Sequence, residues 1–289
     1  RPVPAPGGRG PPGSRWVARR GSTAPTPREG ERCRRPPEHP RRAVCHRGVV
    51  RSIHPIIEAE PDIAAAYAYP AGGCLRVNMV ASADGAAWLA GRSGGLSGGG
   101  DRRIFGVLRG LADVILVGAG TVRTEGYGPA RPRESWAGLR AGRPPAPPIA
   151  VVSRTLDLDF GGPLFTECAP GARTIVITSA AAPADRRAAA AERADVLIAG
   201  EEMVDVAAAV RLLRERGLTR ILCEGGPVLN AELAAAGLID ELALTISPML
   251  TGGDAARILN GAATVTPLAL VHVLEEDGFL FCRYRREAR

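Results

Sequence analysis

Residues 113–128 read DVILVGAGTVRTEGYG and decide the fold class of this chain. An apolar strand pattern ends at Gly118-Ala119-Gly120, and Thr121 and Val122 then fall in the first turn of an expected helix. The first N–H groups of a helix have no partner within it, and with the helix dipole they favour a phosphate, which glycines allow to approach closely. The stretch therefore predicts a strand, a turn and a helix, with an anion site at the turn.

A second unit of the same kind begins at the expected strand 221–223. This strand ends at Glu224-Gly225-Gly226, and Pro227 stands at the position that favours a helix start. Two such turns indicate a pyrophosphate or two separate phosphates. Neither turn matches the G-x-G-x-x-G fingerprint or the G-x-x-x-x-G-K-[ST] loop, and the chain contains no lysine. A standard Rossmann or nucleotide-hydrolase fold is therefore disfavoured.

Short apolar runs alternate with helical patterns through the body of the chain. Strands are expected at residues 75–80, 114–117, 149–152, 174–178, 196–198 and 221–223. Helices are expected at residues 101–111, 203–216 and 227–237, with Asp101 as a cap or charge for the first turn of the first of them. This alternation is typical of a parallel sheet covered on both faces.

The end of the chain has a different pattern. Residues 241–248 alternate in polarity, and the runs 270–274 and 279–284 flank Asp277-Gly278, which indicates an antiparallel hairpin. An irregular proline-rich connection is expected at 129–148. Together these patterns predict an α/β fold with a mixed, mostly parallel sheet, flanking helices and a C-terminal antiparallel hairpin.

Charge is unevenly distributed along the 289 residues. Residues 1–51 carry 13 arginines and three acidic residues, a balance of +10, whereas the whole chain has a formal net charge of +7. Residues 52–289 therefore carry −3, the difference of these two values, and lack the basic excess that follows a nucleic-acid backbone. Residues 1–50 are expected to be a disordered tail, with an unfolded extension favoured over an RNA-contacting arm or a transit peptide.

The remaining composition excludes several classes of protein. No apolar run reaches the roughly eighteen residues of a membrane span and no signal peptide is visible, so a cytoplasmic protein is expected. The six cysteines lack C-x-x-C spacing and are expected to be free thiols. The histidines form no cluster with acidic residues, and no metal is predicted.

Five motifs carry a resemblance to a known family. They are NMVASADG at 78–85, GGLS at 94–97, DRR at 101–103 with LR at 108–109, VGAGTV at 117–122 and EGGP at 224–227. In order and spacing they resemble the reductase domain of bacterial riboflavin-biosynthesis deaminase-reductases. The resemblance implies a dihydrofolate-reductase-like fold, NADPH as cofactor, a homodimer, and a reductase domain at 51–289 with its core at 75–285.

On the cofactor side, the resemblance implies contacts from both glycine turns and from the end of the third strand. Thr121 and the N–H groups after it would meet the pyrophosphate, and Ser153 and Arg154 the adenosine 2′-phosphate. A guanidinium at that place favours NADPH over NADH. The full implied set is Val80, Gly118, Gly120, Thr121, Val122, Glu125, Ser153, Arg154, Gly225, Gly226, Pro227 and Val228.

On the substrate side, the resemblance implies that a phosphorylated ribosylamino-pyrimidine is held by Ser93, Arg109, Pro129 and Arg131 and that Glu224 touches its reacting sugar. In the family the hydride goes to C1′ of the opened ribosylamine.

Two carboxylates are candidate catalytic residues. Glu224 is the nearest candidate for the proton donor, although water can also serve. Asp84 resembles the family's loop beside the nicotinamide, and a plain turn aspartate is an equal interpretation.

Several functions stay open at this point. The strings H-x-E and P-C-x-x-C, which mark the zinc deaminase domain of bifunctional members, do not occur, so the chain is expected to be at most a reductase. Dihydrofolate or another pterin is an alternative substrate on the same fold. A non-catalytic nucleotide-binding protein, or an RNA-associated factor that uses the arginine-rich tail, is the alternative from another class.

Overall fold

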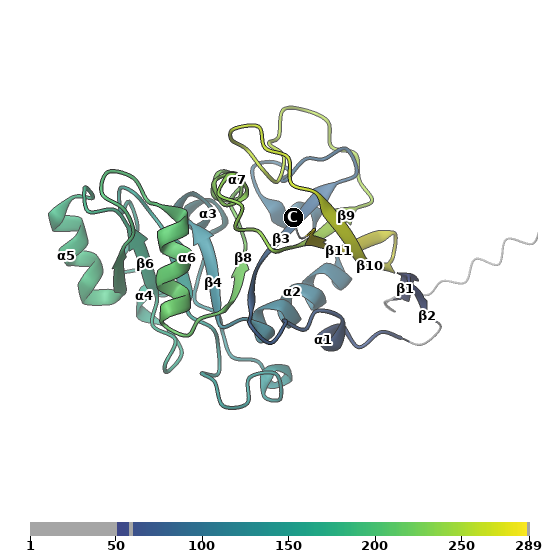
Figure 1. The fold of residues 1–289 in the computed structure, drawn as a ribbon, viewed down its shortest axis with the longest axis horizontal. Helices are drawn as coiled ribbons and strands as arrows, with labels where there is room; N and C mark the ends of the chain where they lie inside the picture. The colour runs from purple at the N-terminus through teal and green to yellow at the C-terminus, as the bar shows by residue number, and fades with distance from the viewer. Residues whose placement is uncertain (1–50, 58–59, 288–289) are drawn as a thin grey trace, which may run out of the picture. The chain divides into compact units, whose positions relative to one another are not determined.

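The computed structural model describes residues 51–57 and 60–287, so the tail predicted for 1–50 lies outside the described residues. The described residues contain an 11-stranded sheet in the order β2-β1-β10-β11-β9-β3-β8-β4-β5-β6-β7 (Figure 1). Neighbours from β9 to β7 pair in parallel, and neighbours from β2 to β9 pair antiparallel. The predicted mixed, mostly parallel α/β sheet is confirmed.

The strands are β1 (Arg51–His54), β2 (Ile56–Ile57), β3 (Cys74–Ser82), β4 (Val114–Gly118), β5 (Ile149–Val152), β6 (Ile175–Thr178), β7 (Asp195–Ile198), β8 (Arg220–Cys223), β9 (Glu241–Ser247), β10 (Leu268–Glu276) and β11 (Phe279–Arg286). The helices are α1 (Ile63–Ala66), η1 (Ser93–Leu96), α2 (Gly99–Leu111), α3 (Ala119–Glu125), η2 (Glu134–Trp136), α4 (Pro163–Thr166), α5 (Ala184–Arg193), α6 (Val206–Glu215) and α7 (Pro227–Ala235).

Alternate residues of β4 face two separate apolar layers. Ile115 and Val117 belong to the cluster that contains buried residues of α2 and α3. Val114 and Leu116 belong to the cluster that contains buried residues of α6 and α7. Because all four side chains are buried, each contributes about 1.5–3 kcal/mol to folding. Helices therefore cover the sheet on both faces, as the continuous apolar run of β4 predicts.

The structure corrects the expected start of the first long helix. Helix α2 begins at Gly99, with Gly98 as its N-cap residue, and no side chain caps it. The carboxylate of Asp101 instead accepts hydrogen bonds from the Ser97 hydroxyl at 2.5 Å and the Thr245 hydroxyl at 2.6 Å. Asp101 therefore links α2 to β9 rather than capping its own helix, and it supplies the predicted acidic charge in the first turn.

The C-terminal hairpin is confirmed. Strands β10 and β11 pair antiparallel and are joined at Asp277 and Gly278, whose φ angles are +51° and +83°. A two-residue turn with both φ angles positive suits the right-handed twist of the strands. The predicted order of parallel units followed by an antiparallel pair is therefore observed.

The proline-rich connection at 129–148 is tied to the end of α2. Arg140 donates to the carbonyls of Gly110 and Ala112, and Arg143 donates to those of Leu111 and Ala112. Cationic side chains at a helix C-terminus satisfy carbonyls that lack helical partners. These bonds hold the connection in place without a long regular element. Within the described residues, no helix is long and apolar enough to cross a membrane.

Candidate active site

A cavity of about 1010 Å³ lies at the carboxyl ends of four parallel strands. Val80 of β3, Gly118 of β4, Val152 of β5 and Glu224, which follows β8, all line it. Ligands of open α/β sheets bind at this edge because loops and helix starts converge there. The cavity is thus built from the strand ends that the sequence predicts to meet.

A second cavity of about 360 Å³ shares part of its wall with the first. Arg109, Glu125 and Tyr127 line both cavities. A ligand in either cavity can therefore contact these three side chains, which form the shared wall.

The two glycine turns pack against each other at the large cavity. The N–H of Gly118 donates to the carbonyl of Gly225 at 2.8 Å. A Cβ at Gly226 would lie 2.5 Å from Oγ1 of Thr121, and Gly225 has a φ of +87°. Both positions therefore require glycine. Helix α7 begins next to this contact with Pro227 in its first turn, as predicted.

Glu224 is held by side chains from two other elements. Its Oε1 accepts from Nε of Arg109 at 2.8 Å, and its Oε2 accepts from Nη2 of Arg109 at 2.7 Å. The hydroxyl of Tyr127 also donates to Oε2, at 2.5 Å. The carboxylate is 2% exposed, and its backbone N–H continues the strand pairing to Leu116. The fold thus fixes an almost fully buried carboxylate at the wall of the cavity.

The surroundings of Glu224 shift the ionisation of its partners. Burial of Tyr127, reinforced by the adjacent Glu224 carboxylate, raises the pKa of Tyr127 well above its usual value. Burial alone would lower the pKa of Arg109, but the ion pair with Glu224 raises it. The Arg109 guanidinium also lies over the ring of Phe105, 4.3 Å from its centroid. Arg109 therefore stays a cation and Tyr127 a hydroxyl donor.

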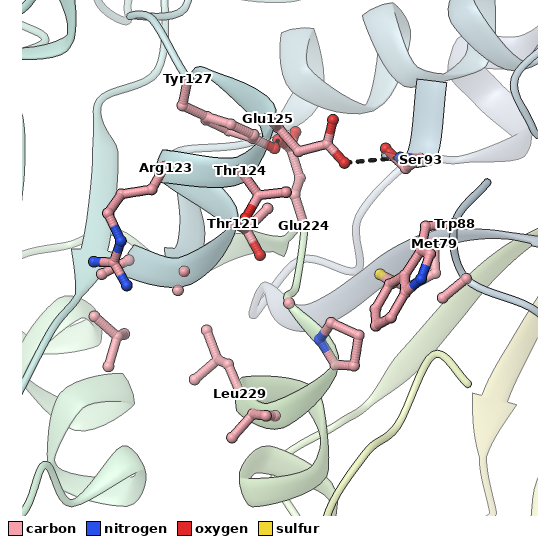
Figure 2. Close-up of a pocket in the computed structure, with 18 of the residues that line it drawn as sticks. Met79, Trp88, Ser93, Thr121, Arg123, Thr124, Glu125, Tyr127, Glu224 and Leu229 are labelled. Carbon is pink, nitrogen blue, oxygen red and sulfur yellow. Dashed lines mark hydrogen bonds between the residues drawn. The ribbon is translucent and has the colours of Figure 1, made fainter. Parts of the chain in front are cut away.

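Loop residues complete the large cavity on another side. The carboxylate of Glu125 accepts from the backbone N–H of Ser93 at 2.8 Å, which ties η1 to the end of α3. Figure 2 shows this bond, with Trp88 and Met79 on one side of the cavity and Arg123 on the other. Trp88 gives the cavity a flat aromatic surface that the sequence prediction did not include.

The end of β5 places a free cation at the large cavity. Arg154 is exposed and, among the described residues, makes no hydrogen bond or ion pair. Ser153 beside it is buried, and its hydroxyl accepts from the N–H of Leu156 at 3.0 Å. Of the two residues predicted at the 2′-phosphate, the arginine is therefore the exposed cation, whereas the serine is buried.

The second cavity contains predicted and unpredicted arginines. Arg131 lines it and pairs with Glu167 at 2.7 Å near the surface. Arg133 lines it too, lies over the Trp136 ring at 5.5 Å, and has no carboxylate partner in the described part of the chain. A Cβ at Gly106 would be 2.8 Å from Nη1 of Arg133, so this glycine leaves room for the guanidinium.

Asp84 lines neither cavity. Its carboxylate accepts from the Ser82 hydroxyl and from the N–H groups of Gly252 and Thr251. These bonds, that of Ser82 first, hold the pKa of Asp84 far below its usual value. The geometry of Asp84 is that of a turn residue which joins two loops.

The structure brings most of the predicted site residues together. The large cavity is lined by Val80, Ser93, Arg109, Gly118, Gly120, Thr121, Glu125, Ser153, Arg154, Glu224, Gly226, Pro227 and Val228. The small cavity is lined by Arg109, Glu125, Pro129 and Arg131. Val122 lies in the core and Gly225 behind the turn, and they line neither cavity.

The sequence prediction did not include several residues that line the cavities, among them Trp88, Tyr127 and Arg133. Tyr127 lies two residues after a predicted contact, Glu125, and Arg133 lies two residues after Arg131. Both stand in irregular chain without a periodic pattern, so proximity to predicted contacts was the available signal.

Comparisons with known proteins identify the family of this chain. A model of the family described as RibD C-terminal domain matches residues 74–277, more than half of the chain. The 2,5-diamino-6-ribosylamino-4(3H)-pyrimidinone 5′-phosphate reductase of Methanothermobacter thermautotrophicus is 33% identical over 183 residues, which cover 63% of this chain and 81% of the relative. The protein of the same name from Archaeoglobus fulgidus is 31% identical over 167 residues, 56% of this chain and 74% of the relative.

A solved structure is also similar to this chain. It is a pyrimidine reductase-like protein from Corynebacterium diphtheriae, which is 27% identical, with a TM-score of 0.68 over 80% of this chain and 96% of that one. Sequence and structure therefore point to the same group of proteins.

Proposed function

We propose that this chain, which belongs to the RibD C-terminal domain family, is an NADPH-dependent reductase of a phosphorylated ribosylamino-pyrimidine in riboflavin biosynthesis. The observation that carries the proposal is the buried carboxylate of Glu224, which stands beside two paired glycine turns and next to the wall shared by two cavities. The names of the two reductases to which the chain is similar support the choice of substrate class.

The residues of the large cavity fit a dinucleotide with an extra phosphate. Its volume of about 1010 Å³ is at the upper end of ligand sites, which suits an extended cofactor. Gly118 and Gly226 line the cavity at the starts of α3 and α7, and neither places a side chain there. Thr121 would hold the pyrophosphate at these turns, and Arg154 would pair with the 2′-phosphate.

The small cavity fits the phosphate end of the substrate. Arg131 and Arg133 line it, and Arg133 has no competing carboxylate among the described residues. A guanidinium that is already stacked on Trp136 loses little freedom when it binds a phosphate. We assign the ribosyl group to the shared wall, between the phosphate and the nicotinamide.

In the proposed reaction, C1′ of the opened ribosylamine gains a hydride and the adjacent nitrogen gains a proton, which gives a ribitylamine. Bound NADPH supplies the hydride. The chain would hold the two ligands end to end, so that the reacting carbon faces the nicotinamide.

Glu224 serves the reaction as a hydrogen-bond acceptor. Both of its oxygens already accept bonds from Arg109 or Tyr127, and these bonds fix the orientation of the carboxylate as an acceptor. We propose that Glu224 accepts from a hydroxyl of the ribosyl group and that water delivers the proton.

The test is a direct assay of binding and turnover. Calorimetry of the purified protein should detect one NADPH per chain. Oxidation of NADPH, followed by the absorbance of the reduced nicotinamide, should require the phosphorylated ribosylamino-pyrimidine and should not occur with dihydrofolate. Binding of NADPH with turnover of dihydrofolate only would replace the proposed substrate, and no binding at all would refute the proposal. Light scattering of the same sample tests the homodimer, which remains a prediction.

A further inference from the structure

We infer that Tyr127 is a positioning residue that fixes Glu224 and leaves one of its oxygens open to the substrate. The inference rests on the proposed function, because it assigns a substrate hydroxyl to that open oxygen. Tyr127 is absent from the motifs that carry the family resemblance, and it is the aromatic residue of the wall between the two cavities.

The end of α3 determines where Tyr127 points. Gly126 ends the helix in the left-handed conformation with φ of +68°, and the N–H of Tyr127 then donates to the carbonyl of Val122 at 3.0 Å. This turn directs the tyrosine ring toward the end of β8, as Figure 2 shows for Tyr127 and Glu224. The backbone turn and the bond to Oε2 of Glu224 therefore determine together where the hydroxyl lies.

Counting acceptor positions identifies the open oxygen of Glu224. A carboxylate has about four lone-pair positions, two on each oxygen. Oε2 accepts from both Arg109 and Tyr127, whereas Oε1 accepts from Arg109 alone. One position on Oε1 remains among the bonds of the described residues. Tyr127 thus occupies Oε2 and directs an incoming donor to Oε1.

Tyr127 suits a fixed donor better than a proton source. Burial and the Glu224 carboxylate raise its pKa well above the usual value, so the hydroxyl keeps its proton throughout the neutral range. The Arg109 guanidinium also lies over the Tyr127 ring, 5.6 Å from its centroid, and this contact limits the movement of the arginine. The tyrosine therefore constrains Glu224 directly and through Arg109.

A double-mutant cycle tests this inference. Tyr127→Phe keeps the ring under Arg109 and removes only the bond to Oε2, so kcat/KM for the pyrimidine substrate should fall about tenfold, the loss expected for one hydrogen bond to a charged group. The loss should arise through a higher KM for the pyrimidine substrate, with the Kd for NADPH unchanged. In a Glu224→Gln background the same substitution should cost less than about twofold, because its target is already altered.

Tyr69→Phe is the matched control. The Tyr69 hydroxyl is buried without a hydrogen-bond partner and Tyr69 does not line either cavity, so this variant should keep wild-type kinetics. An equal tenfold loss in both backgrounds, or a parallel loss of NADPH affinity and unfolding midpoint, would show a structural role and overturn the inference. Full activity of Tyr127→Phe would also overturn it while leaving the proposed function intact. A wild-type protein that binds NADPH but does not reduce the pyrimidine would refute the function itself.

Discussion

Two buried glutamates, Glu224 and Glu241, bind arginine in different ways. Glu224 stands at the carboxyl ends of the parallel strands, beside the cavity, and accepts three hydrogen bonds. Glu241 begins β9 and accepts from three arginines, with contacts of 2.6 Å to Arg76, 2.8 Å to Arg283 and 3.2 Å to Arg285. Both carboxylates are 2% exposed, so burial alone does not distinguish them.

The difference lies in how completely each carboxylate is satisfied. Glu241 is a register partner of both Arg76 and Arg285, so strand pairing delivers donors to both of its oxygens. Although burial opposes ionisation, Arg283 and Arg76 hold the pKa of Glu241 below its usual value. Glu224 receives donors from one arginine and one tyrosine and keeps an open position. A saturated carboxylate serves the fold, whereas an incompletely satisfied one at a cavity can serve a ligand.

The largest expected effect is that of Glu241→Gln. The change leaves Arg76, whose side chain is 0% exposed, without its counter-charge, and breaking a buried ion pair costs about 3–5 kcal/mol. Urea unfolding should show this loss, while the molecules that remain folded should bind NADPH with wild-type Kd.

Glu224→Gln is the matched substitution at the large cavity. It should destabilise less, because the Arg109 side chain is 17% exposed and can recover some hydration, but it should reduce kcat/KM by about 100-fold. If the two variants lost stability equally and both kept activity, the distinction between the two glutamates would be wrong.

The next prediction concerns how the stability of the region around Glu241 depends on pH. His272 is buried, and among the described residues its Nε2 has no hydrogen-bond partner. Burial, followed by the positive charges of Arg283 and Arg76, lowers the pKa of His272 to about 4, although the Glu241 carboxylate acts in the opposite direction. The ring also meets Tyr67 edge-on at 4.9 Å. Because the unfolded chain binds this proton from about pH 6.5 downward, stability is complete above that pH and falls as the pH drops toward 4.

The free energy of unfolding should fall by about 2–3 kcal/mol over this pH range, because each pKa unit corresponds to about 1.4 kcal/mol and partial solvation of the ring reduces the sum. Urea unfolding at pH 7.0, 5.5 and 4.5 measures it. His272→Phe should flatten this profile, with His54→Phe as the control, because His54 is exposed. A steep profile in the His272 variant would assign the acid sensitivity to other groups.

The sequence predicts the cavity site around Glu224 better than the arginine cluster around Glu241. The two glycine turns, the strand ends and Pro227 carry local signals, and the family that their motifs indicated is confirmed by the match over residues 74–277. The Arg76–Glu241–Arg283 cluster joins residues 165 and 42 positions apart, which no local pattern encodes. Helix α5 was missed for another reason: its apolar residues are all alanine, which gives no strong period.

Within the site, the sequence predicts positions along the backbone better than partnerships between side chains. The resemblance implies that Arg109 holds a substrate phosphate. In the structure, its Nε and Nη2 already donate to Glu224. Tyr127 and Glu224 are 97 residues apart, and their contact depends on how α3 ends. Such contacts follow from the three-dimensional path of the chain, which sequence patterns do not specify.

The smallest predicted effect concerns the choice of cofactor at the open site. Arg154 lines the large cavity with no partner among the described residues, so its substitution breaks no bond that supports the fold. Arg154→Gln should therefore leave the urea midpoint unchanged, in contrast to Glu241→Gln. It should raise the Kd for NADPH about tenfold, the loss of one charge-assisted bond to the 2′-phosphate, and leave the Kd for NADH unaltered.

Arg173→Gln is the control for this prediction, because Arg173 is an exposed arginine that pairs with Asp195 and does not line either cavity. Titrations of wild type and both variants with NADPH and NADH are followed by tryptophan fluorescence, to which Trp88 at the cavity contributes. They give the change in Kd for each cofactor in each variant. Equal weakening of both cofactors by Arg154→Gln would place the arginine at the pyrophosphate instead. If both cofactors bound unchanged, Arg154 would not contact the cofactor, and another residue of the large cavity would have to distinguish NADPH from NADH.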